Sequence, residues 1–327
     1  MLPRQTKPKS VALSSMRAVP VRRRAFLASV TALAGRAVLP AGEGQGGKTR
    51  LILLGTGGGP RARKNSSAPA QVIVIRDRPY VVDCGSGVGR QLAFAGVPLP
   101  ALRHVFITHH HSDHNADYGN LILQAWVAGL RTRVDAWGPP PLEKITRLFF
   151  EMSAYDIETR IADEGRVPLA PLVHAHELTQ AGPVMEDEYV KVTAALVDHP
   201  PVVPAFAYRF DAPDRSIVIS GDTAPSDNLV KLARGADVLV HEALYEPAID
   251  RLVARVPNAA TFKQHFRASH TAAADCGRIA AAAGVRTLVL SHFVPPDDPE
   301  VTDEMWMEAA RAHFRGTVIV GKDLMEI

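Results

Sequence analysis

The sequence contains little cysteine, and its two thiols are far apart. Cys84 and Cys276 form no C-x-x-C pair in the 327 residues, so neither a disulfide scaffold nor a thiolate zinc site is indicated. A P-loop is also absent, because no Lys-Ser/Thr pair follows Gly57-Gly58-Gly59 at the required spacing. No internal repeat of short fixed period occurs. These absences exclude disulfide-rich proteins, P-loop NTPases and repeat proteins.

An excess of basic charge is found only at the amino terminus. Positions 1–41 hold eight Lys and Arg residues and no Asp or Glu, so the formal net charge of +3 becomes −5 for the remainder. The remainder lacks the basic excess expected of a nucleic-acid-binding protein. The charge pattern therefore favours a small-molecule substrate over nucleic acid.

The amino terminus resembles a twin-arginine export signal. Arg23-Arg24-Ala25-Phe26-Leu27 has the pattern R-R-x-F-L, and the apolar run that follows, Leu27–Leu39, is interrupted by Arg36. This run is too short for a stable membrane anchor. We therefore expect residues 1–41 to be an export signal and the mature protein to be periplasmic or secreted. A basic tail without a targeting role is the alternative.

Short apolar runs separated by turns predict a layered α/β domain over residues 48–327. Strands are expected at Arg50–Leu54, Gln71–Arg76, Tyr80–Val82, Arg103–Ile107, Val190–Val197, Ala205–Phe210, Ser216–Ile219, Val238–Val240, Thr287–Leu290 and Thr317–Val320. Helices are expected at Gly87–Ala95, Tyr118–Gly129, Leu142–Met152, Asp227–Ala233, Thr271–Ala283 and Asp303–Phe314.

Two segments leave questions of assembly open. The Pro-rich stretch 138–188 is expected to be an insertion or a lid near the site. The apolar helix Leu121–Leu130 could pack in the core or against a second subunit, so a homodimer is compatible with the sequence.

A cluster of histidines and a carboxylate follows one predicted strand. His109, His111, Asp113 and His114 form H-x-H-x-D-H directly after the apolar run Val105-Phe106-Ile107. Such groups suit a cation such as zinc, although manganese and iron also accept these ligands. A His-rich surface loop is the alternative.

Further candidate ligands follow other strands. His199, Asp222 and His292 each come just after the carboxyl end of an apolar run, which is where ligands gather in layered α/β folds. Each alone would more often be structural. Together with the H-x-H-x-D-H cluster, they predict a metal site.

These motifs resemble the metallo-β-lactamase superfamily, over roughly residues 48–327. The resemblance implies a single-domain, four-layer αββα sandwich with two zinc ions at one edge. It assigns His109, His111 and His199 to one metal, Asp113, His114 and His292 to the other, and Asp222 to both. A water bridging the metals would attack the substrate, with Asp113 and Asp222 in the catalytic centre.

Within the superfamily the closest resemblance is to the tRNase Z and arylsulfatase-like branch. Five segments carry this resemblance: Leu54-Gly55-Thr56-Gly57-Gly58-Gly59, Asp83-Cys84-Gly85, Ala207-Tyr208-Arg209-Phe210, His241-Glu242-Ala243 and Ser269-His270-Thr271. The resemblance makes His270 a catalytic residue that protonates the leaving oxygen, and Glu242 could orient it. A helix-start residue without chemistry is the alternative for His270.

One departure bears on the substrate. Only Asp211–Ile219 separate Phe210 from Ser220, so the basic arm with which tRNase Z proteins grip tRNA is missing. We therefore expect an exported binuclear zinc hydrolase that cleaves a phosphodiester or sulfate ester of a small molecule. The alternatives are a lactone or β-lactam hydrolase, a tRNA 3′-end endoribonuclease, which the missing arm disfavours, and a non-catalytic metal-binding protein.

Overall fold

Alternating apolar residues build two β-sheets that pack face to face. The computed structural model describes residues 48–254 and 257–327. Leu51 and Leu53 belong to an apolar cluster shared with strands of the second sheet, whereas Ile52 and Leu54 belong to a cluster shared with helices. This division follows from the alternation of side chains along a strand. One face of each sheet is thus buried between the sheets.

The first sheet contains six strands in the order of the sequence, the first three antiparallel and the rest parallel. They are β1 (Arg50–Gly55), β2 (Ala70–Ile75), β3 (Arg78–Val82), β4 (His104–Phe106), β5 (Val134–Gly138) and β6 (Val173–Glu177). The C-terminal segment pairs with β1, where the amide of Ile327 donates to the carbonyl of Leu51 over 2.9 Å.

The second sheet contains seven strands in the order β13-β12-β11-β10-β9-β8-β7. They are β7 (Gly182–Glu186), β8 (Lys191–Val197), β9 (Ala205–Asp211), β10 (Ser216–Ile219), β11 (Val238–Leu244), β12 (Thr287–Val294) and β13 (Thr317–Val320). Strands β10 to β13 are parallel to one another. Both β8 and β10 are antiparallel to β9, which lies between them, so β8 runs in the same direction as β10. Their carboxyl ends therefore lie at one edge of the sheet.

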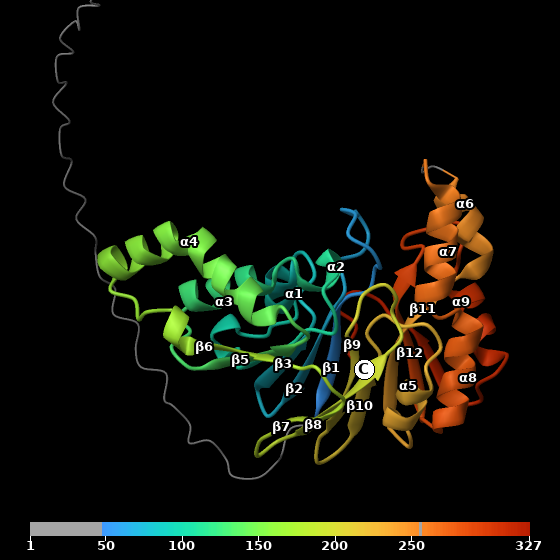
Figure 1. Cartoon of the computed structure of the whole chain (residues 1–327). Coiled ribbons are helices and arrows are strands. Elements are labelled where there is room, and N and C mark those ends of the chain that lie inside the picture. The colour runs from blue at the N-terminus through green and yellow to red at the C-terminus, as the bar shows by residue number, and fades with distance from the viewer. Residues whose placement is uncertain (1–47, 255–256) are drawn as a thin grey trace, which may run out of the picture. The chain divides into compact units, whose positions relative to one another are not determined.

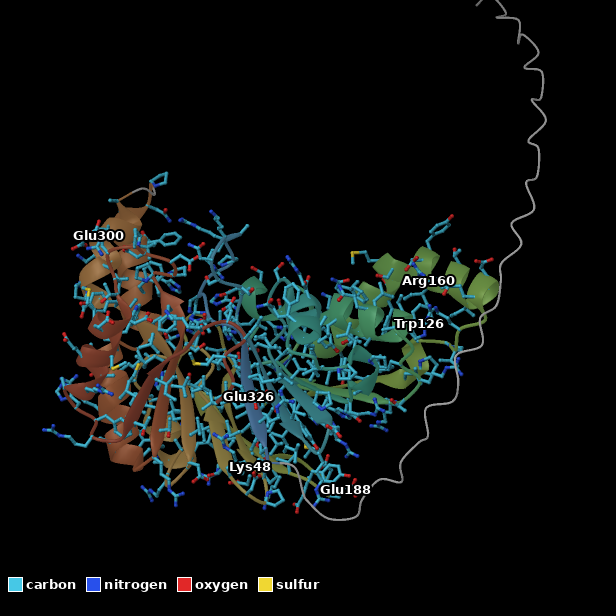
Figure 2. All side chains as sticks on the ribbon, turned by 180° about the vertical axis from the view of Figure 1, so that it is seen from behind. Lys48, Trp126, Arg160, Glu188, Glu300 and Glu326 are labelled. Atoms are coloured by element: carbon cyan, nitrogen blue, oxygen red, sulfur yellow. The ribbon has the colours of Figure 1, made fainter. Side chains whose placement is uncertain are left out.

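Helices cover the outer faces of both sheets and complete an αββα sandwich (Figure 1). The first sheet is covered by α1 (Val88–Phe94), α3 (Tyr118–Val127) and α4 (Leu142–Glu164), and the second by α5 (Asp227–Leu232), α8 (Ala273–Ala283) and α9 (Asp303–Arg311). Trp126 of α3 is buried on the helix-covered side of the first sheet, and Arg160 of α4 lies further out (Figure 2). The predicted four-layer, single-domain fold is confirmed.

Three further helices lie around the edge where the two sheets meet. They are α2 (Ser112–Asn115), α6 (Ile249–Val253) and α7 (Ala259–Ser269). In Figure 1, α6 and α7 rise beyond the end of the second sheet, and α2 lies between them and the helices of the first sheet. Among the described residues, the structure contains no helix long and apolar enough to cross a membrane.

All the predicted strands and helices occur, most of them with shifted ends, but several elements were not predicted. Strands β5, β6 and β7 and helices α2, α6 and α7 are additional. The segment 138–188, predicted as an insertion or lid, contributes β6 to the first sheet and β7 to the second. The strands of this segment are therefore built into the sandwich rather than laid over the site. The predicted export signal lies outside the described residues.

The apolar face of α3 packs inside the chain. Leu121, Ile122, Ala125 and Trp126 all belong to the core between α3 and the first sheet. Of the two placements that the sequence left open for this helix, the structure has the one in the core.

Candidate metal centre

The first group of candidate ligands joins both sheets. His109 and His111 lie between β4 and α2, His199 follows β8 and Asp222 follows β10. The Nε2 atoms of His109 and His199 each lie 3.1 Å from Nδ1 of His111, and Oδ2 of Asp222 lies 3.8 and 3.9 Å from them. Tetrahedral ligands of a zinc ion lie about 3.3 Å apart, which follows from bonds of about 2.0–2.1 Å. The spacing of these atoms therefore suits one metal ion.

The second group lies beside the first and shares a carboxylate with it. Asp113 and His114 are on α2, and His292 is on β12. Nε2 of His292 lies 3.4 Å from Oδ2 of Asp113 and 3.2 Å from Oδ2 of Asp222. Nε2 of His114 lies 3.3 Å from Oδ1 of Asp222. Asp222 thus contacts residues of both groups.

A bulge in β12 directs His292 toward this centre. Glu242 of β11 pairs with Ser291 and Ala243 pairs with Phe293, so His292 is left without a partner residue in the ladder. Its φ is 46°, in the left-handed region that a histidine rarely adopts. Bulges commonly turn a side chain out of a sheet beside a functional site. The backbone here is shaped to present the imidazole.

Burial and charge in the cluster fit a cation. Burial, together with the neighbouring His114, lowers the pKa of His109 well below its ordinary value, so its ring is neutral and has a lone pair to offer. Burial also disfavours a charged His114, but Asp222, Asp83 and Asp113 outweigh it and raise the pKa of His114 well above the ordinary value. The three carboxylates therefore favour a positive charge in the space between the two ligand groups.

Two polar atoms in the centre, 3.3 Å from each other, form no hydrogen bond with any described residue. Nε2 of His114 and Oδ1 of Asp222 are buried and form no hydrogen bond within the described residues. A buried polar atom without a partner is costly unless something else binds it. Imidazole nitrogens with carboxylate oxygens are a donor set that divalent metals such as zinc accept. The residues present therefore fit a divalent metal.

Asp83, directly after β3, supports ligands of both groups. Its Oδ2 accepts from Nδ1 of His114 over 2.8 Å, and its Oδ1 accepts from the amide of Thr108 over 2.8 Å. The hydroxyl of Thr108 in turn lies 3.0 Å from Nδ1 of His109. Carboxylates in this place fix the orientation of a ligand histidine. His199 is held in another way, since its Nδ1 donates to the carbonyl of Ser269 over 2.8 Å.

Arg63, which the sequence did not single out, fixes the glycine loop beside the second group. Its guanidinium donates to the carbonyls of Gly57, Gly58 and Gly59 over 2.6–3.1 Å. The amide of Gly59 then donates to Oδ2 of Asp113 over 2.8 Å. These contacts hold the glycine loop directly beside a ligand of the second group. No local motif marks Arg63, because its partners are backbone carbonyls.

His270, at the end of α7, lies against the centre and is paired with Glu242. A ring nitrogen of His270 is within 4.8 Å of donor atoms of Asp222 and His292. Its Nδ1 lies 3.3 Å from Oε2 of Glu242. Burial acts against a charged ring, but the Glu242 carboxylate outweighs it and raises the pKa of His270 to about 8. His270 can therefore carry a proton at neutral pH.

A pocket of about 440 Å³ opens onto the cluster. Side chains of both ligand groups and His270 lie on its wall, and most of the remaining wall comes from the loop after β1 and from α6 and α7. His265 of α7, which the sequence analysis did not single out, also lines it. The sequence did not predict α7. The short distance in sequence between His265 and Ser269-His270-Thr271 therefore did not indicate that His265 would line the pocket.

Three other histidines lie outside the two ligand groups. His110 faces the carbonyl of Pro139, with its Nε2 at 2.7 Å. His176 pairs with Asp135 at 2.6 Å on the first sheet, and His174 lies on the same strand, β6. None of these belongs to either ligand group.

Fold and cluster together define a metal-dependent hydrolase, and comparisons with known proteins agree. The sequence profile described as "Beta-lactamase superfamily domain" matches residues 78–293. A protein named Ribonuclease Z from Mycobacterium bovis is 33% identical over 281 residues, which cover 85% of this chain and 97% of that protein. The chain belongs to the metallo-β-lactamase superfamily, and proteins named Ribonuclease Z are among its relatives.

Solved structures share the fold. The metallo-beta-lactamase fold protein YhfI from Bacillus subtilis superimposes with a TM-score of 0.62 at 22% identity, over 85% of this chain and 98% of its own. The short form of human tRNase Z gives a TM-score of 0.62 at 21% identity, with the same coverage.

Proposed function

We propose that this protein is a metal-dependent phosphodiesterase that cleaves RNA with two divalent metal ions. The observation that carries the proposal is a pair of ligand groups that share Asp222 and are buried except for the half-buried His111, with the His270–Glu242 pair beside them. The relatives named Ribonuclease Z support RNA as the substrate. They reverse the order of the sequence-based hypotheses, which placed a small exported ester first and RNA cleavage among the alternatives.

His109, His111 and His199 would hold one metal ion, Asp113, His114 and His292 the other, with Asp222 between them. Metal ions bound here supply Lewis acidity and lower the pKa of a bound water toward neutrality.

The chain's own residues would position the diester and supply the proton. Asp83 and Arg63 keep ligands of the two groups in place. His270 donates a proton to the leaving oxygen, and Glu242 stabilises the charged imidazole before transfer. General acid catalysis of this kind contributes roughly a hundred- to ten-thousand-fold. It matters most for the alkoxide leaving group of RNA, which is a poor one without a proton.

Initial rates of the zinc-loaded full chain test the proposal. The substrates are an RNA with a 3′ extension, bis(p-nitrophenyl) phosphate, p-nitrophenyl sulfate and a lactone, with His111→Ala as the control. We expect cleavage of the RNA and of the phosphate diester, lost in the control. Cleavage of the sulfate or the lactone alone would replace the proposed reaction with that one. No turnover of any substrate at full metal content would make the protein a non-catalytic metal binder.

A further inference from the structure

The inner face of α7 brings aromatic rings to the pocket next to His270. Phe262, His265 and Phe266 have the spacing i, i+3, i+4, which places them on one side of the helix, and all three line the pocket. The rings of Phe262 and Phe266 lie 5.8 Å apart, and that of Phe266 lies 5.9 Å from the ring of His270. The rings form a continuous wall that leads to the proposed proton donor.

This wall is held by its own apolar core. Phe262 and Phe266 pack against a small cluster that includes Ile249 and Val294, separate from the cores of the two sheets. Both phenylalanines nevertheless stay partly exposed, on the pocket side. Partly exposed aromatic rings beside a catalytic group offer a flat surface on which another ring can stack.

Another part of the pocket wall carries positive charge. Arg61 and Arg63, on the loop after β1, both line it. Arg63 is engaged with the glycine carbonyls, whereas Arg61 is exposed. Guanidinium groups favour an anionic ligand and bind phosphate well. A pocket lined by both an aromatic wall and an arginine loop suits a ligand that has both a planar ring and a phosphate.

We propose that the α7 wall, formed by Phe262, His265 and Phe266, stacks the nucleobase of the nucleotide that carries the leaving oxygen. This inference rests on the proposed function and adds to it a subsite for a base, formed by α7 beside the metal ligands. Stacking on an aromatic side chain strengthens binding of a base by about tenfold or more. It is tolerant of base identity, because every base has an aromatic face.

Direct binding to the zinc-loaded full chain tests the wall without relying on turnover. Titration calorimetry compares uridine 5′-monophosphate with ribose 5-phosphate, which has the same phosphate and sugar but lacks the base. We expect the nucleotide to bind about tenfold more tightly to the wild-type protein. In Phe262→Leu and Phe266→Leu this ratio should fall toward one, while ribose 5-phosphate binds as before. Leucine preserves apolar packing on Ile249 and Val294 but lacks the ring.

A phenylalanine outside the pocket provides the matched control. Phe94 of α1 is 58% exposed and does not line the pocket, so Phe94→Leu should leave the ratio unchanged. Equal affinity of the two ligands for the wild-type protein would overturn the inference, and so would a ratio that the two variants do not lower. If diesters are hydrolysed and the ratio is one, only this inference fails. If no diester is hydrolysed but the nucleotide binds more tightly through the wall, the proposed function fails instead.

Discussion

Replacing Glu242 by glutamine tests whether this carboxylate sets the protonation of His270. Both side chains are buried. Glutamine has the same shape, and its Oε1 can still accept from the amides of Thr271 and Thr223, which Glu242 now binds at 2.8 and 3.3 Å. We therefore expect the fold and the metal content to be unchanged. The variant removes the charge that faces Nδ1 of His270 and little else.

The expected effect is a shift of the alkaline limb of the pH profile. The raised pKa means that protonated His270 is present at low pH and is lost as pH rises through about 8 in the wild-type protein. Without the carboxylate, we expect the pKa of His270 to fall toward its ordinary value of about 6.5, a change of about 2 kcal/mol. At pH 7.5 about three quarters of the wild-type histidine carries the proton, against less than about a tenth in the variant.

The assay measures kcat between pH 6 and pH 9 with a dinucleotide as substrate. Its leaving alkoxide needs the proton that His270 donates. We expect the variant to be about eightfold slower at pH 7.5 and nearly equal to wild type at pH 6, as the protonated fractions dictate. Bis(p-nitrophenyl) phosphate should show little effect, because nitrophenolate leaves without a proton. Glu246→Gln, at an exposed residue paired with Arg267, is the matched control. An alkaline limb that stays at the wild-type position in the Glu242 variant would refute the reasoning.

Four other changes have defined outcomes. His111→Ala should lower metal content and activity together, measured by elemental analysis and initial rates, since His111 contacts two other ligands. Asp83→Ala should weaken metal binding by about 10- to 100-fold in a chelator competition, as is typical for carboxylates that orient ligands. Gly58→Ala should reduce the metal content to one ion per chain, because its Cβ would lie 2.6 Å from Cε1 of His292; two ions in this variant would contradict that. Changing Arg23-Arg24 to two lysines should keep the protein in the cytoplasm by cell fractionation, if the predicted export signal is used.

Much of the site could be predicted from the sequence because its residues follow strands. Each of β4, β8 and β10 is a short apolar run, and the histidine or aspartate comes within a few residues of its end. Strands that run in the same direction bring their ends to one edge, so local patterns were enough to bring distant residues together. His292 required more, because only a bulge in β12 turns it toward the others.

The parts that were not predicted depend on contacts between distant segments. Arg63 acts through backbone carbonyls, which leave no trace in the sequence. Strands β6 and β7 are only partly buried and lack the apolar runs that marked the others. Helix α7 has few fully buried residues, since Ser269 is the only one described as buried along its length. The aromatic face of α7 lines the pocket instead of packing fully in a core. The helix therefore lacks the stripe of apolar residues by which a core helix is recognised in a sequence.

The short connection between β9 and β10 limits how RNA could be held. A tight turn closes these strands, with the amide of Ala212 donating to the carbonyl of Arg215 over 3.1 Å. The M. bovis relative aligns over 281 residues, which are 97% of its own length, so it too has little room for a long insertion. The lack of a long arm between β9 and β10 is therefore compatible with the relationship to this protein. If RNA is the substrate, its grip must come from the pocket walls, where the arginine loop and α7 flank the metal ligands. Variants of those walls should then change KM for RNA more than any change in the β9–β10 turn.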